Sequence, residues 1–195
     1  MIKNDKLTEL KYYENFFESK VGFEWKNSVD LCVKIIENYG NDCEAYIRVI
    51  YFLHNIILEE HHEGITHEQI EVMLSTYFSE SKIKFSRNPE YLFFIGKILY
   101  IAEWYFGINE GPKPTIEYQA FKMQKKASEL EPNNILYELA WRFSLGEKIA
   151  GYLASQILLY DKEHIEWLKS KGFPGDYILD SLDYSKRDFE GKILH

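Results

Sequence analysis

Apolar residues recur along this chain at the three- and four-residue spacing of an amphipathic helix, and the alternation typical of strands is nearly absent. The clearest run comprises Tyr46, Val49, Ile50, Leu53, Ile56 and Ile57. Such signals return about every twenty residues, which predicts an all-α fold of about eight to ten helices. We expect an array of antiparallel helical hairpins, a short solenoid or bundle, in a single domain over residues 1–195.

End signals place several helix boundaries. Thr66 and Gln69 form a capping box, in which the hydroxyl and the amide each satisfy a backbone amide at the helix start. Asn88-Pro89 predicts an N-cap followed by proline at the first helical position, and Asp161 predicts another cap. The pattern further predicts a helix between residues 4 and 22, an almost wholly apolar helix over 91–106, a loop at 111–114, a cap at Thr115, a turn at 173–175 and a short helix over 176–184.

Residues 116–134 carry the most specific pattern. Ala120 and Ala127 are seven residues apart and share a helical face, which allows a close helix approach, and Pro132 then ends the helix. Together with Leu92-x-x-Ile95-Gly96-x-x-Leu99, the segment over about residues 90–134 resembles a tetratricopeptide repeat. Gln124 departs from that family, which has an aromatic residue there. The resemblance implies a right-handed stack of helix pairs whose concave face binds peptides or protein segments.

The net charge of −8 limits the partners. Nucleic acids and anionic membranes are bound through Lys and Arg, so neither is expected, whereas a basic protein partner is compatible. The alternative is that the charge only keeps the protein in solution. The most apolar run, residues 92–108, contains Lys97 and Glu103, which argues against a membrane span. The first residues lack the apolar core of a signal peptide, and we expect a cytoplasmic, bacterial protein.

Two segments are candidates for binding that partner. Asp176, Asp180 and Asp183 share one helical face, and tyrosines beside them suit a protein interface. The alternative for this segment is a solvated helix face. The second candidate segment lies around Trp141, and its alternative is packing in the core. The predicted partner-binding residues are Asp176, Tyr177, Asp180, Asp183, Tyr184, Asp188, Tyr137 and Arg142.

Metal chemistry and catalysis have weaker signals. Glu59-x-x-His62 has the spacing of a helix-borne metal site, with His67 nearby, but the second Glu-x-x-His of such sites is missing. Asp161-x-x-His164 is the nearest substitute. Glu103 stands in an apolar helix, where burial could raise its pKa or a side chain from another helix could pair with it. No catalytic motif occurs, so we expect no enzyme, no cofactor and no metal.

Three functions follow as hypotheses. The first is a non-catalytic protein-binding module, such as an immunity or antitoxin-like inhibitor that covers a basic nuclease toxin. The second is a regulatory or scaffolding repeat protein that captures a linear peptide, with Gln119, Lys122, Lys126 and Arg142 as groove candidates. The third is a metal-binding helical bundle enzyme that uses Glu59 and His62.

Overall fold

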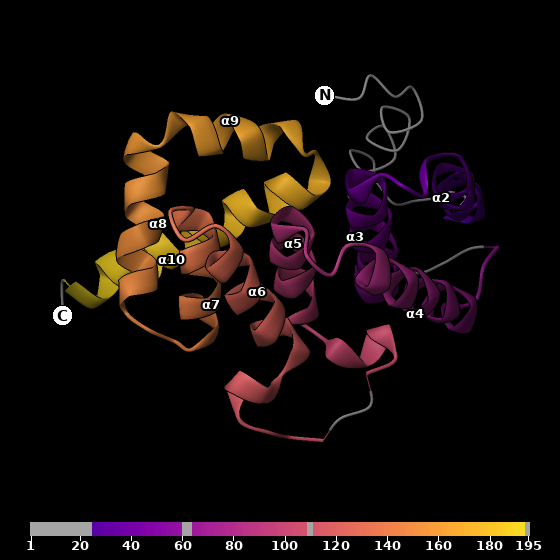
Figure 1. Cartoon of the computed structure of the whole chain (residues 1–195), viewed down its shortest axis with the longest axis horizontal. Helices are drawn as coiled ribbons and strands as arrows, with labels where there is room; N and C mark the ends of the chain where they lie inside the picture. Colours follow the sequence, from indigo (N-terminus) through magenta and orange to yellow (C-terminus); the bar gives the residue numbers. More distant parts are fainter. Residues whose placement is uncertain (1–24, 60–63, 109–110, 194–195) are drawn as a thin grey trace. The chain divides into compact units, whose positions relative to one another are not determined.

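Every regular element in this computed structural model is helical over the residues that it describes, 25–59, 64–108 and 111–193 (Figure 1). The all-α prediction is confirmed. The chain divides into two compact units, Met1–Ser86 with Tyr105–Gly107, and Arg87–Trp104 with Ile108–His195. The single domain and the antiparallel hairpins stay predictions. The helix expected between residues 4 and 22 lies outside the described residues.

The first unit is organised around helix α3 (Cys43–Glu59), against which α2 (Trp25–Tyr39) and α4 (His67–Lys84) both pack. Aromatic rings form much of the contact. The ring centres of Trp25 and Phe52 are 6.1 Å apart, and those of Tyr46 and Tyr77 are 6.4 Å apart. The Nζ atom of Lys84 donates to the Tyr46 hydroxyl (2.9 Å), which ties the end of α4 to α3.

The capping box predicted at the start of α4 is confirmed. The Gln69 amide donates to Thr66 Oγ1 (3.2 Å), and the Thr66 amide donates to Gln69 Oε1 (3.0 Å). None of the described helices combines the length and the apolar character that crossing a bilayer requires.

His54 lies in α3 and is 1% exposed. Among the histidines in the described part of the chain, it is the one that is fully buried. Its ring stacks on Phe106 at 5.4 Å and meets Tyr105 edge-on at 6.3 Å. Its Nε2 atom has no hydrogen-bond partner among the described residues. Burial disfavours the charged imidazole and lowers its pKa to about 4.

This histidine makes the stability of the protein depend on pH. Between about pH 6.5 and about pH 4 the unfolded chain binds a proton at His54 that the folded chain excludes, so stability falls as the pH falls. In the wild-type protein, we expect His54 to lower the free energy of unfolding by up to about 1.4 kcal/mol for each pH unit of acidification across that window. His54→Leu should abolish this contribution. Urea unfolding followed by circular dichroism at a series of pH values measures it. Identical slopes in both proteins would contradict the assignment.

In the second unit, α5 (Pro89–Leu99), α6 (Gln119–Leu130) and α7 (Ile135–Ser144) pack in succession. Gly96 allows α5 and α6 to approach closely, because a Cβ atom there would lie 2.8 Å from Cγ of Gln124. The Gln124 side chain is fully buried; its Nε2 donates to the Gly96 carbonyl (2.8 Å) and its Oε1 accepts from Ser144 Oγ (2.7 Å). Where the repeat family has an aromatic residue, this chain therefore places a buried amide that joins three helices.

Two predicted features around this helix set are wrong. Helix α5 ends at Leu99, and a separate 3₁₀ helix, η1 (Glu103–Phe106), replaces the second half of the helix expected over 91–106. Thr115 does not cap α6, because a short 3₁₀ helix, η2 (Thr115–Glu117), lies between them. The N-cap of α6 is Tyr118, whose side chain makes no capping bond.

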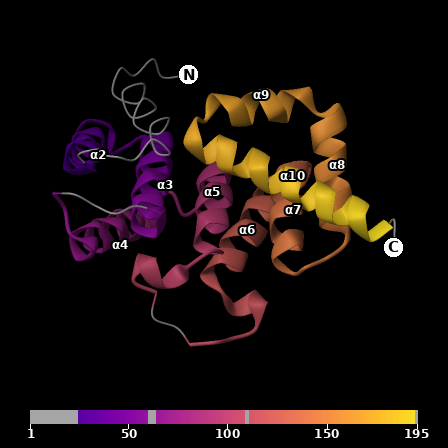
Figure 2. The ribbon, with the colours of Figure 1, turned by 180° about the vertical axis from the view of Figure 1, so that it is seen from behind.

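The unit is completed by α8 (Ile149–Tyr160), α9 (Lys162–Ser170) and α10 (Phe173–Ile193), and α10 lies against α8 and α9 (Figure 2). The cap at Asp161 is confirmed, since its Oδ1 accepts from the His164 amide (3.0 Å). The turn predicted at 173–175 is wrong. These residues form the first turn of α10, where proline is tolerated because the amide that it lacks has no intrahelical partner.

The start of α10 touches the end of α9. A Cβ atom built on Gly175 would lie only 1.8 Å from the carbonyl oxygen of Leu168, whereas one on Gly191, in the same helix, would meet nothing within 4 Å. Only glycine therefore permits this helix crossing.

Alanine at these two positions should act in opposite directions. We expect Gly175→Ala to destabilise the protein by about 2–3 kcal/mol, because backbone must move away from backbone. Gly191→Ala should be neutral or stabilising by up to about 1 kcal/mol, because alanine is the better helix former. Thermal unfolding of both variants tests the pair. Equal effects would show that the crossing imposes no constraint.

Candidate functional site

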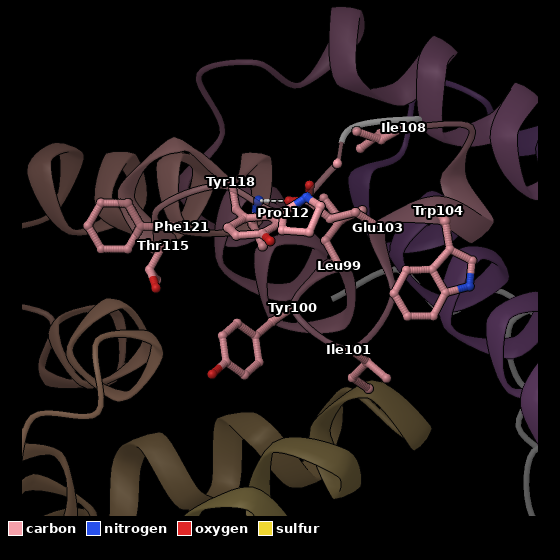
Figure 3. A pocket seen from close by; sticks show the side chains of 12 residues that line it. Leu99, Tyr100, Ile101, Glu103, Trp104, Ile108, Pro112, Thr115, Tyr118 and Phe121 are labelled. Atoms are coloured by element: carbon pink, nitrogen blue, oxygen red, sulfur yellow. Dashed lines mark hydrogen bonds between the residues drawn. The ribbon is translucent and has the colours of Figure 1, made fainter.

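The second unit contains a hollow of about 780 Å³ between the end of α5 and the start of α6 (Figure 3). Four aromatic side chains from different segments line it: Tyr100 follows α5, Trp104 belongs to η1, and Tyr118 and Phe121 begin α6. We call this hollow the Glu103 pocket. Its lining residues are Leu99, Tyr100, Ile101, Glu103, Trp104, Ile108, Gly111, Pro112, Thr115, Tyr118, Ala120 and Phe121.

Glu103 is the charged side chain among these lining residues, and 8% of its surface is exposed. Its Oε1 atom accepts a hydrogen bond from the Ala120 amide (2.7 Å). Ala120 is the second residue of α6, so this carboxylate supplies the cap that the Tyr118 side chain does not. A negative charge at a helix N-terminus is also favoured by the helix dipole.

The second carboxylate oxygen is less well satisfied. Oε2 of Glu103 is buried and has no hydrogen-bond partner in the described part of the chain. Lys113 Nζ lies 3.9 Å from it, within ion-pairing range but beyond a hydrogen bond. The same ammonium lies 4.9 Å from the centre of the Tyr118 ring. One lysine of the chain is therefore held between a carboxylate and an aromatic face at the edge of the pocket.

The rim of the Glu103 pocket is open to solvent. Trp104 is 60% exposed and Tyr100 is 46% exposed, unlike the buried aromatic residues of the core. Exposed indole and phenol rings beside a buried carboxylate suit the binding of a partly apolar group that carries hydrogen-bond donors. Since Glu103 already caps a helix, the arrangement favours binding over general acid–base chemistry.

The predicted acidic residues lie on α10, with Asp176, Asp180, Asp183 and Asp188 all exposed. Asp183 pairs with Arg187 (2.9 Å), so part of the charge on this face is neutralised locally. Tyr177 is half-buried, and burial raises its pKa to about 12.

Tyr184 and Asp188 take part in a second, smaller hollow of about 390 Å³, which Tyr100 and Glu147 also line. Because Tyr100 lines both hollows, its ring connects the predicted α10 residues with the Glu103 pocket.

Tyr137 and Arg142, both on α7, differ from the exposed predicted residues of α10. Tyr137 is 3% exposed and packs on Phe93 at 5.0 Å, which fits the core interpretation. Arg142 is held by Glu138 (2.8 Å) and Glu147 (2.7 Å), and the hydrogen bond that it donates to Glu147 outweighs burial and raises the pKa of Arg142.

The weak metal candidates are not brought together in the described residues. His67 lies at the exposed start of α4, while His62 and the side chain of Glu59 lie outside the described part. No group of three His, Cys, Asp or Glu side chains among the described residues is placed to hold a metal ion. Asp161 and His164 instead pair with each other (2.6 Å); burial raises the pKa of Asp161, but the hydrogen bonds from His164 outweigh it and the pKa is lowered.

Lys97 and Glu103 do not meet. The ammonium of Lys97 lies over the Phe143 ring at 4.4 Å and 3.5 Å from Ser181 Oγ, and burial lowers its pKa to about 8. Glu103 faces Ala120 and Lys113 instead. The two charged side chains inside the apolar run at 92–108 therefore contact different residues and do not pair with each other.

No protein-family model, curated protein or solved structure matches this chain. The resemblance to tetratricopeptide repeats stays a prediction.

The sequence singled out Glu103 but missed the aromatic lining of its pocket. A continuous helix over 91–106 places Tyr100 and Trp104 in an apolar core, whereas the break after Leu99 leaves both exposed. The available signal was the Gly111-Pro112-Lys113-Pro114 loop, which requires a surface turn next to these rings.

Two substitutions separate the capping role of Glu103 from its charge. We expect Glu103→Ala to destabilise the protein by about 2 kcal/mol, because the Ala120 amide loses its partner. Glu103→Gln keeps an oxygen that can accept that hydrogen bond and should cost less than about 1 kcal/mol. Chemical denaturation of the three proteins measures this. Equal losses in both variants would mean that the cap is not what stabilises α6.

Proposed function

We propose that this chain is a non-catalytic module that binds a basic protein and covers part of its surface. A nuclease toxin held inactive by its inhibitor is the specific example that we favour. The observation that carries the proposal is the Glu103 pocket, in which exposed Trp104 and Tyr100 stand beside a buried carboxylate. Tryptophan and tyrosine are enriched at the residues that dominate protein–protein binding energy.

The charge distribution supports a basic partner. The chain carries a net charge of −8, and the aspartates of α10 are exposed next to Tyr184, which is 61% exposed. Such a surface would speed the approach of a basic protein and disfavour acidic ones. The electrostatic attraction would extend over about 8–10 Å at physiological salt, so the association should be sensitive to ionic strength.

A linear peptide is the second candidate for the partner. The volume of the Glu103 pocket, about 780 Å³, is that of a site for a small ligand or a few side chains. Binding that survives when the partner is reduced to a short segment would favour this form over a folded surface.

Affinity capture from the lysate of the native cells tests the proposal with a matched pair of variants. We expect the wild-type chain to retain one basic protein at low salt and to lose most of it at high salt. Trp104→Ala should weaken retention by about tenfold or more, because it removes the exposed aromatic anchor at the rim of the pocket. Tyr160→Ala, which removes a 74% exposed aromatic residue from α8 outside the Glu103 pocket, should retain the partner normally.

A second pair tests the charge. Asp180→Lys on α10 should slow association, whereas Glu37→Lys, an equal charge change at an exposed position of α2, should have a smaller effect. Retention that ignores salt and survives Trp104→Ala would contradict the proposed function.

A further inference from the structure

We infer that the Glu103 pocket is a receptor for an organic cation, and that the group it fits best is the guanidinium of an arginine side chain. This inference rests on the proposed function, because it names the part of the basic partner that enters the pocket. It follows from three features of the pocket: a buried carboxylate oxygen that lacks a donor, a lysine that the chain itself places beside it, and aromatic walls.

The first feature is the state of the Glu103 carboxylate. Glu103 lines the hollow; its Oε1 is committed to the Ala120 amide, whereas its Oε2 is buried and accepts no hydrogen bond within the described residues. An ionised carboxylate removed from water needs donors to each oxygen. A ligand that brings an N–H group into the pocket supplies the missing one, and a charged donor supplies the stronger bond.

The second feature is Lys113. Its side chain is only 12% exposed, and its ammonium lies 3.9 Å from Glu103 Oε2 and 4.9 Å from the Tyr118 ring centre. The protein thus already holds a cation between this carboxylate and an aromatic face. Because the distance exceeds a hydrogen bond, the internal cation compensates the charge only in part. An incoming cation must therefore compete with Lys113 for the carboxylate of Glu103.

The third feature favours arginine over lysine. The pocket is lined by Tyr100, Trp104, Tyr118 and Phe121. A guanidinium is planar, stacks on aromatic faces and is more weakly hydrated than an ammonium, so it loses less on entering. It also presents several N–H donors in one plane, which suits a pocket whose lining combines one carboxylate with aromatic side chains.

The experiment uses Nα-acetyl-arginine amide as the probe and Nα-acetyl-citrulline amide as the control, which has the same shape and no charge. The readout is the indole N–H resonance of Trp104 in isotope-labelled full-length protein, assigned by its loss in Trp104→Leu. We expect arginine to shift this resonance with a dissociation constant of about a millimolar, as suits a single side chain. Citrulline should bind at least about tenfold more weakly, because its neutral ureido group cannot form an ion pair with Glu103.

Two variants must move the affinity in opposite directions. Glu103→Gln keeps the acceptor for Ala120 but removes the charge, and should weaken arginine binding by about tenfold or more. Lys113→Met keeps the aliphatic stem but removes the internal cation, and should tighten binding by about fivefold. A merely structural role for either residue predicts no such reversal.

Equal shifts with citrulline and arginine, no shift at millimolar arginine, or equal affinities in wild type and Glu103→Gln would each overturn the inference. These outcomes are distinct from failure of the proposed function. If arginine does not bind but partner capture still depends on Trp104, the proposed function stands and the inference falls. If arginine binds as expected but no protein is captured, the cation site stands and the protein-binding function falls.

Discussion

Helix α6 begins without a capping side chain of its own, and the carboxylate of Glu103 supplies that cap from another segment of the chain. The two residues in this bond, Glu103 and Ala120, are far enough apart in sequence that the intervening chain must form a loop. This bond therefore ties the segment after α5 to the start of α6. The aromatic side chains on both segments then face a shared hollow instead of a common core.

The same helix is fixed further along by Gln124. Its amide bonds to Gly96 on α5 and to Ser144 on α7, inside a contact that only a glycine allows. A buried amide with both ends satisfied holds helices in one register, because any shift would leave a polar group without a partner. The walls of the Glu103 pocket are thus positioned by packed helices, which suits a preformed binding surface.

The charges of the second unit have different surroundings and different uses. Lys97 is buried against the Phe143 ring, where its charge is disfavoured, while the partly buried Lys113 lies beside Glu103. Arg142 is fully engaged by two glutamates. The aspartates of α10 remain exposed. The proposed binding of an external cation rests on these aspartates and on the carboxylate of Glu103.

The helical class could be predicted from the sequence, and so could those helix boundaries that depend on local chemistry. The capping box at Thr66, the Asn88-Pro89 start and the Asp161 cap were all predictable, because each cap bonds to an amide within three residues. The sequence also singled out Glu103, since a carboxylate in an apolar run needs an explanation.

The break in that apolar run and the surroundings of the carboxylate depend on contacts between segments that are distant in sequence. Glu103, in the segment that follows α5, bonds to the Ala120 amide of α6, and Gly175, in the first turn of α10, lies against the backbone of Leu168. Neither contact leaves a periodic signal, because its partners are separated along the chain. The pocket could not be read from the sequence for the same reason: its aromatic walls become a site only when distant segments meet.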